Sequence, residues 1–177
     1  MNNIFFKSMV LKQRFYHRNV LQVARDLLGC RLIVKSEMGM VSSIICETEA
    51  YDGEQDLACH ACKGKTKRTS IMYDCGGVWY VYLCYGMHWM LNIVTGPKNY
   101  PATVLIRGTR DFSGPGRLTR NLGLDGSLHG KPAVPSSGLW IEDIPKKKSP
   151  EILTGPRIGV DYAGKEWAQK PYRFWFS

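Results

Sequence analysis

The feature that most constrains the fold is a strict alternation of side chains across Val78–Tyr85, followed by a second apolar run, His88–Val94. Alternation places Tyr80 and Tyr82 on one face of a strand and the residues between them on the other. Gly86 separates the two runs and allows a tight turn. The pattern therefore predicts a β-hairpin whose tip lies at this glycine.

The apolar run Ile44–Tyr51, earlier in the chain, carries charged residues where a buried strand would normally have only apolar ones. Period-two alternation groups Glu47, Glu49 and Tyr51 with Ile45 on one face. An edge strand with a solvated face would explain one such carboxylate. A carboxylate inside an apolar strand is otherwise costly to bury unless it has a partner or a purpose.

Two further apolar runs each hold one polar residue. Asn92 lies within Met90–Val94, and Arg107 ends the run Thr103–Arg107. An acid, an amide and a guanidinium, each embedded in a hydrophobic strand, predict a shared polar pocket.

The chain has 177 residues, of which 44% are apolar and 22% charged, which favours one domain with a sizeable core. The run Asn19–Leu28 predicts an amphipathic helix capped by Asn19 and stopped by Gly29. Residues 1–18 are expected to form a loosely held N-terminal arm, and residues 19–177 the functional domain. Residues 52–77 are expected to form a long polar loop.

Several strands with few helices predict a mixed α/β (α+β) domain around a curved, mainly antiparallel sheet with a protruding β-hairpin. A hairpin is expected from Cys30–Lys35 and Gly39–Tyr51, and a short helix within Gly114–Leu124. Arg157–Val160 and Tyr172–Phe176 are expected to be the strands that close the sheet.

The formal net charge is +9, with a pI of about 9.3. A basic surface favours a polyanionic partner, because cationic side chains release counterions from phosphates. The amino terminus lacks the apolar core of a signal peptide, and no run reaches the length of a membrane span, so an intracellular protein with no membrane partner is expected.

The six cysteines include a Cys59-His60-Ala61-Cys62 motif. A zinc site would require a second ligand pair at defined spacing, and a redox CxxC would be expected at a helix start after a strand. Neither context is evident, so no metal and no cofactor are expected.

A buried carboxylate, clustered tyrosines and a basic surface together fit cleavage of an N-glycosidic bond. A carboxylate can stabilise an oxocarbenium-like sugar and accept a proton from the attacking water. Aromatic rings can stack on a base taken out of a helix, and cations can hold the phosphates.

Motifs from about residue 20 to residue 174 carry a resemblance: ETEAY (Glu47–Tyr51), His60, YVYLCYGM (Tyr80–Met87), LNIV (Leu91–Val94), VLIR (Val104–Arg107), GPGRLT (Gly114–Thr119), PRIGV (Pro156–Val160) and WAQKPYRF (Trp167–Phe174). In this combination the chain resembles the alkyladenine (3-methyladenine) DNA glycosylase family. The resemblance implies a domain related to the C-terminal domain of formyltransferases. It also implies a monofunctional enzyme, expected to be a monomer, that excises alkylated or deaminated purines from the minor-groove side of duplex DNA.

The resemblance also implies a role for each matched position. Glu49 corresponds to the acid that activates the water, and Arg107 to the residue that holds the acid and the water. The base pocket is expected to be formed by Tyr51, His60, Tyr80, Tyr82 and Asn92. Tyr85 corresponds to the residue that enters the minor groove, with Met87 beside it. Contacts to the DNA backbone are expected from Lys63, Lys65, Lys67, Arg68 and Arg117.

Three other readings use parts of the same pattern. An O-glycoside hydrolase would use Glu47 and Glu49, which on a strand lie roughly 6.5–7 Å apart. A bifunctional glycosylase and lyase would require a lysine nucleophile in the pocket, whereas the lysines here fall in loops. A DNA-binding module without catalysis would retain Tyr85 and the basic surface but would not require Glu49 or Asn92.

Overall fold

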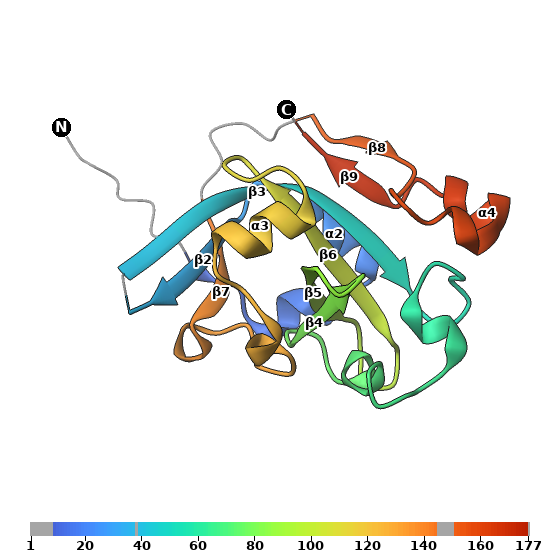
Figure 1. Ribbon diagram of the computed structural model, residues 1–177, viewed down its shortest axis with the longest axis horizontal. Coiled ribbons are helices and arrows are strands. Elements are labelled where there is room, and N and C mark those ends of the chain that lie inside the picture. The colour runs from blue at the N-terminus through green and yellow to red at the C-terminus, as the bar shows by residue number, and fades with distance from the viewer. Residues whose placement is uncertain (1–8, 38, 145–150, 177) are drawn as a thin grey trace.

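A single antiparallel sheet runs through the computed structural model, which describes residues 9–37, 39–144 and 151–176 (Figure 1). Its strand order is β1-β7-β2-β3-β6-β5-β4, and β9 pairs with both β3 and β8. The strands are β1 (Met9–Val10), β2 (Arg31–Ser36), β3 (Gly39–Asp52), β4 (Trp79–Cys84), β5 (His88–Thr95), β6 (Ala102–Thr109), β7 (Leu139–Asp143), β8 (Leu153–Gly155) and β9 (Arg173–Trp175). The predicted class, one α/β domain around an open antiparallel sheet, is confirmed.

The helices are short and lie around this sheet. They are α1 (Gln13–Tyr16), α2 (Val20–Asp26), α3 (Pro115–Asn121) and α4 (Gly164–Gln169), with 3-10 turns η1 (His60–Lys63), η2 (Ser70–Tyr73), η3 (Gly126–Leu128), η4 (Pro135–Ser137) and η5 (Asp161–Ala163). Within the described ranges, none of these helices has the length and apolar character needed to cross a bilayer.

The predicted first helix is confirmed as α2. The side chain of Asn19 accepts hydrogen bonds from the backbone N–H groups of Leu21 and Gln22, which satisfies donors that have no partner in the first turn. The helix packs on the sheet, where the Thr48 hydroxyl donates to the Ala24 carbonyl at 2.9 Å. α2 therefore anchors the middle of β3.

Part of the expected N-terminal arm is packed against the domain. Residues 9–18 include β1, which pairs with β7, and α1. Tyr16 is only 1% exposed and belongs to the main hydrophobic core, while Leu11 is also buried. Residues 9–18 thus contribute side chains to the core, whereas residues 1–8 of the expected arm lie outside the described part of the chain.

The long strand β3 is irregular at its centre. Its pairing with β6 shifts register between Ile45 and Glu47 and again between Glu47 and Thr48. Such irregularities interrupt the two-residue alternation of side chains. The register is the same on either side of this irregularity, with Ile45 opposite Thr109 and Thr48 opposite Ile106, and both Ile45 and Ala50 are buried in the main core.

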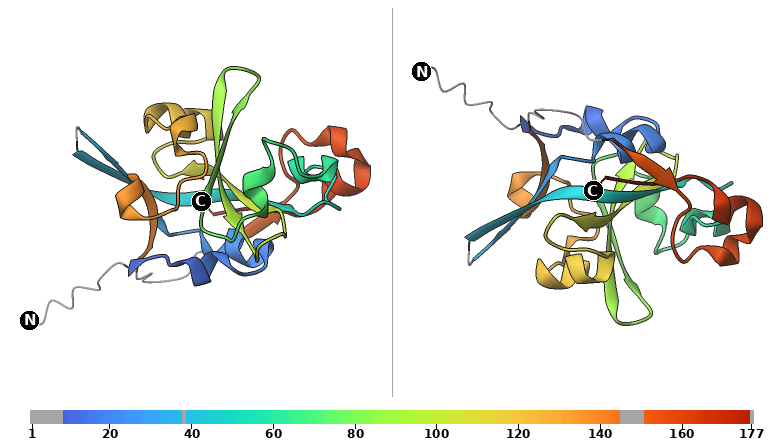
Figure 2. Two further views of the ribbon diagram at one scale, coloured as in Figure 1. Left: turned by 90° about the horizontal axis from the view of Figure 1, so that it is seen from below. Right: turned by 90° about the horizontal axis from the view of Figure 1, so that it is seen from above.

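The second hairpin is confirmed and projects from the body of the molecule (Figure 2). β4 and β5 pair in register, and residues 85–87 form the tip. Tyr85 has φ of 50° and Gly86 has φ of 68°, which is the left-handed pair that a tight two-residue hairpin turn requires. Trp79 and Val81, which alternation placed on the face opposite Tyr80 and Tyr82, belong to the main core.

The end of the chain differs from prediction. Residues 157–160 form no strand, and β8 lies just before them. Pro156 has no N–H to donate, and Gly159 adopts a left-handed φ of 76°, so this segment cannot continue a ladder. It forms an irregular connection, followed by α4, a helix that the sequence pattern did not predict.

Candidate active site

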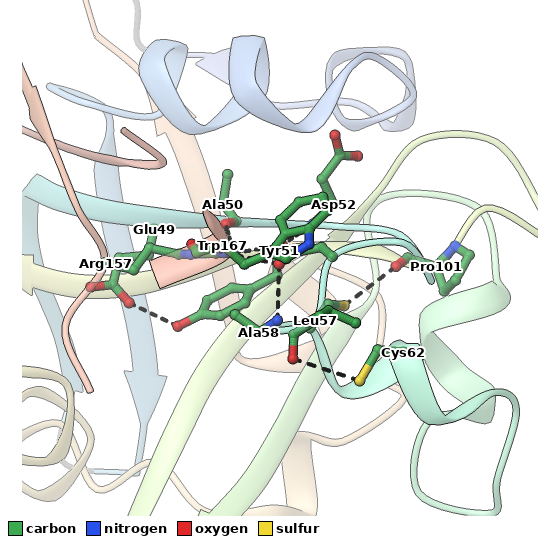
Figure 3. A network of polar contacts seen from close by, with 12 residues as sticks. Glu49, Ala50, Tyr51, Asp52, Leu57, Ala58, Cys62, Pro101, Arg157 and Trp167 are labelled. Atoms are coloured by element: carbon green, nitrogen blue, oxygen red, sulfur yellow. Dashed lines mark hydrogen bonds and ion pairs between the residues drawn. The ribbon is translucent and has the colours of Figure 1, made fainter. Parts of the chain in front are cut away.

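The site is built on the end of β3. Glu49 and Tyr51 share a face, and the Tyr51 hydroxyl donates to Glu49 Oε2 at 2.9 Å (Figure 3). The backbone N–H of Ile158 donates to Glu49 Oε1, also at 2.9 Å. Glu49 is 0% exposed. The carboxylate is thus fully buried, with hydrogen bonds to both of its oxygens.

Arg107 on β6 lies beside this carboxylate. Its Nη1 atom is 3.6 Å from Glu49 Oε1, and its Nε atom is 3.0 Å from Glu47 Oε1. Arg107 therefore lies between two carboxylates. The acid and the guanidinium that the sequence analysis grouped are adjacent in the fold.

Burial is the largest influence on the protonation of Glu49. It raises the pKa of Glu49 above that of an ordinary glutamate, because the charged form loses its hydration. The Arg107 guanidinium, the Ile158 N–H and the Tyr51 hydroxyl stabilise the carboxylate and limit the rise, while the negative charge of Glu47 adds to it. A carboxylate with a raised pKa is a stronger base than an exposed one.

Aromatic rings from two elements line a cavity together with Tyr51. His60 Nδ1 lies 2.8 Å from the Tyr80 hydroxyl oxygen, and the ring centroids of His60 and Tyr82 are 4.6 Å apart. The rings of Tyr80 and Tyr82 are 5.3 Å apart. η1 and β4 thus contribute a cluster of aromatic rings to the cavity lining, and β3 contributes Tyr51.

The His60 ring is held neutral. Burial, followed by the positive charges of Arg68 and Lys63, lowers the pKa of His60 to about 4. At neutral pH this imidazole therefore carries one proton. The guanidinium of Arg68 also lies over the Tyr82 ring, 4.9 Å from its centroid.

Asn92 lies on β5, between the paired residues Tyr80 on β4 and Leu105 on β6. It is 2% exposed, and its Nδ2 atom donates to the Met90 carbonyl at 3.2 Å. Its side chain also lines the cavity, so the sheet contributes a polar group to the cavity surface.

These groups line one cavity of about 900 Å³, a size typical of ligand sites. The predicted residues that line it are Glu49, Tyr51, His60, Lys63, Arg68, Tyr80, Tyr82, Tyr85, Asn92 and Arg107. The predicted residues outside its lining are Met87, Lys65, Lys67 and Arg117. The structure thus brings the acid, the arginine and the pocket residues together.

The hairpin tip stands at the edge of this cavity. Tyr85 is 88% exposed and Met87 is 70% exposed. Exposed apolar side chains that lie next to one another, as these two do at the tip, can mark an interaction site. The expected backbone-contacting residues, Lys63, Lys65, Lys67, Arg68 and Arg117, are all exposed.

Arg157 is a site residue that the sequence analysis did not identify. Its guanidinium is buried, forms a two-pronged ion pair with Asp56, and lies 4.8 Å from the centroid of the Tyr51 ring. The next residue, Ile158, supplies the N–H that binds Glu49. Arg157 sits in the PRIGV motif, but nothing in local periodicity indicates that its side chain turns inward.

Both cysteines of the Cys59–Cys62 motif form hydrogen bonds to backbone carbonyl groups. The Cys59 thiol donates to the Pro101 carbonyl, and the Cys62 thiol to the Leu57 carbonyl (Figure 3). Burial raises the pKa of Cys59 to about 12, opposite to the lowered pKa of redox cysteines. Among residues 9–37, 39–144 and 151–176, no three or more His, Cys, Asp or Glu side chains gather in a group that could hold a metal ion.

The chain is similar over most of its length to one protein family and to several known proteins. The model of the family described as Methylpurine-DNA glycosylase matches residues 14–112 and 109–177. The chain is 42% identical to a protein of Psychrobacter cryohalolentis, over 90% of each chain. It is 43% identical to one of Methanocella arvoryzae, over 94% of this chain and 92% of the relative. It is 45% identical to one of Myxococcus xanthus, over 93% and 89%. All three names contain the words 3-methyladenine DNA glycosylase.

Proposed function

Because the chain belongs to the methylpurine-DNA glycosylase family, we propose that it is a monofunctional DNA glycosylase of base-excision repair. It flips alkylated or deaminated purines out of duplex DNA and hydrolyses the N-glycosidic bond. Its substrates are 3-methyladenine, 7-methylguanine, hypoxanthine and ethenoadenine. The products are the free base and an abasic site.

The burial of Glu49 against Arg107 is the observation that carries this proposal. In the reaction the bond between C1′ and the purine nitrogen breaks and its electrons leave with the base. The 3-methyladenine and 7-methylguanine nucleotides carry a positive charge, so these bases leave neutral, whereas hypoxanthine and ethenoadenine take up a proton from solvent as they leave. A water oxygen bonds to C1′, and its proton passes to Glu49. The carboxylate also stabilises the positive charge that develops on the sugar.

The aromatic rings of the cavity are suited to an extruded purine. Tyr51 stacks on one face of the base, and His60 and Tyr82 on the other, because every purine offers a π-face. Tyr80 supports His60 through their short contact. Asn92 forms the floor, where it crowds the 2-amino group of undamaged guanine.

The exposed tip and the basic surface suit duplex DNA approached from the minor groove. Tyr85 fills the gap that the flipped nucleotide leaves, with Met87 beside it. Lys63, Lys65, Lys67, Arg68 and Arg117 hold the backbone through their charges.

The placement of lysines supports hydrolysis without strand cleavage. A glycosylase with lyase activity forms a Schiff base with an amine in its pocket. In the part of the chain that the structure describes, Lys63 is the one lysine that lines the cavity, and it is exposed, so it lacks the burial in an apolar pocket that activates a lysine nucleophile. Borohydride is therefore expected to trap no covalent complex between enzyme and DNA.

An O-glycoside hydrolase would need two carboxylates facing one sugar. Glu47 is absent from the cavity lining, and its Oε1 atom accepts a hydrogen bond from Arg173 Nε at 2.6 Å. The two acids therefore cannot flank a ligand in this cavity, which disfavours that alternative.

The direct experiment uses duplex oligonucleotides that each carry one lesion, with alkaline cleavage of abasic product as the readout. We expect base release by the wild-type protein, and about 10²–10⁴-fold less by Glu49→Gln, since a positioned general base contributes about that factor. Duplex binding should persist, because Gln can still accept the Ile158 hydrogen bond.

Two controls make the experiment decisive. Equal thermal unfolding of both proteins would show that the variant is folded. Retained turnover by Glu49→Gln would exclude the general base. Binding without base release by the wild-type protein on every lesion would favour a DNA-binding module instead.

A further inference from the structure

We propose that Glu47 is a positioning residue that holds the Arg107 guanidinium back from Glu49, with Arg173 fixing Glu47 in turn. The inference rests on the proposed function, because it assigns the device that keeps Glu49 competent as a base. It gives a role to an acid that touches neither the cavity nor, by this account, the substrate.

Glu47 is shared between two arginines. Its Oε1 atom accepts from Arg173 Nε at 2.6 Å and lies 3.0 Å from Arg107 Nε. The three residues come from adjacent strands, because β3 pairs with β6 on one side and with β9 on the other. Glu47 therefore connects β9 to the arginine of the site.

The side chain of Glu47 has little freedom. A Cβ atom placed on Gly108 would lie 3.3 Å from Glu47 Oε2, so the carboxylate sits close against the β6 backbone. The guanidinium of Arg173 also lies over the Trp175 ring, 4.4 Å from its centroid, and this contact restrains the Arg173 side chain. In the sheet Glu47 pairs with Gly108 on β6 and with Trp175 on β9, so its backbone is held on both sides.

The distances show how Arg107 divides its contacts. Arg107 lies nearer to Glu47, with 3.0 Å from Nε to Oε1, than to Glu49, with 3.6 Å from Nη1 to Oε1, and both contacts are ion pairs. If Glu47 lost its charge, Arg107 would turn to the remaining carboxylate. A close pair with Arg107 would stabilise ionised Glu49 and make it a weaker base.

Among the residues that the structure describes, several charged or titratable groups interact with Glu49 and enter this balance. β3 contributes Glu47 and Tyr51, β6 contributes Arg107, and the segment after β8 contributes Arg157. Arg173 acts through Glu47. Removing the negative charge of Glu47 should therefore strengthen the attraction between Arg107 and Glu49. Removing the positive charge of Arg173 should weaken this attraction, because Glu47 would then interact more strongly with Arg107.

The test is the pH dependence of single-turnover base release between pH 4 and 9 for wild type, Glu47→Gln and Arg173→Gln. In Glu47→Gln we expect the acid limb, the part of the pH–rate profile where the rate falls as Glu49 is protonated, to move to lower pH by about one unit or more. A carboxylate that gains an arginine partner shows a shift of this kind. The plateau rate should fall about 3–10-fold, because a weaker base transfers the proton less readily. In Arg173→Gln the limb should move to higher pH.

A matched control and an independent readout accompany the test. Glu142→Gln neutralises another half-buried glutamate, which accepts from Trp140 Nε1 on β7, and should leave the limb in place. The ¹³C carboxyl titration of Glu49, identified by its loss in Glu49→Gln, should move in the same directions without DNA. Where Glu47→Gln does not fold, Glu47→Asp retracts the carboxylate and should give a smaller shift of the same sign.

The outcomes separate the two proposals. An unchanged limb and unchanged Glu49 titration in Glu47→Gln, or shifts of one sign in both variants, would overturn the positioning role while the wild-type activity stands. No base release by the wild type would overturn the proposed function itself. The NMR titration would still report whether Glu47 controls Arg107.

Discussion

Among single residues, Arg157 shows how this fold accommodates charge in its interior. Its guanidinium pairs with Asp56 through both terminal nitrogens and donates to the Ala50 carbonyl at 2.9 Å. Both charged side chains are 0% exposed. The pair connects the loop after β3 to the segment that carries the Ile158 N–H. It therefore helps to position Glu49 through the hydrogen bond that Ile158 donates to it.

Removing half of this pair should be costly, because an uncompensated charge would remain buried. Asp56→Asn is expected to lower the free energy of unfolding by about 3–5 kcal/mol, measured by urea denaturation. Asp26→Asn breaks an ion pair with Arg18 whose side chains are 34% and 52% exposed, and should cost less than about 1 kcal/mol. Equal costs for the two variants would contradict this account.

At the scale of elements, the hairpin β4–β5 combines two roles. One face of β4 supplies Tyr80 and Tyr82 to the cavity, and the other supplies Trp79 and Val81 to the core. Core packing on one face therefore orients the aromatic rings on the other. The tip, beyond this packing, leaves Tyr85 exposed to a partner.

The tip is expected to act on DNA and not on stability. Tyr85→Ala should lower affinity for a lesion-containing duplex about 5–150-fold, the equivalent of about 1–3 kcal/mol of stacking, with little change for undamaged duplex. Fluorescence anisotropy with both duplexes measures this.

Two methionines provide the matched comparison for the tip. Met87 and Met40 are each 70% exposed, but Met40 lies at the start of β3. Met87→Ala should weaken lesion binding and Met40→Ala should not. Unchanged affinity in Tyr85→Ala would refute the proposed wedge.

On the scale of the whole molecule, the net charge of +9 gives the protein a long-range attraction to phosphate. Four of the expected contacts lie together in the run Lys63–Arg68, beside the cavity. The β2–β3 hairpin lies at the other end of the molecule (Figure 1). Binding is therefore expected to depend on where a cation lies as well as on the total charge.

Salt dependence tests this expectation. The slope of log affinity against log salt should become less steep by about one in Lys67→Ala, if this side chain neutralises one phosphate. Lys35→Ala removes the same charge from β2 and should leave the slope unchanged. Equal slopes in both variants would show that Lys67 makes no specific phosphate contact.

Much of the fold follows from local patterns. Asn19 and the apolar stripe after it predict α2, and the alternation before Gly86 predicts β4, because capping and side-chain periodicity depend on neighbours in sequence. The same alternation correctly places Glu49 and Tyr51 on one face. The motifs along the chain were sufficient to indicate the family.

Only the tertiary structure decided which residues far apart in the sequence come into contact. The pairing of β3 with β6 shifts register around Glu47, and an irregular segment took the place of the strand expected at residues 157–160. Glu47 meets Arg173 across 126 positions of sequence, and Glu49 meets Ile158 across 109. The physical reason is that periodicity specifies which face a side chain takes, whereas strand register, bulges and burial specify what it meets there.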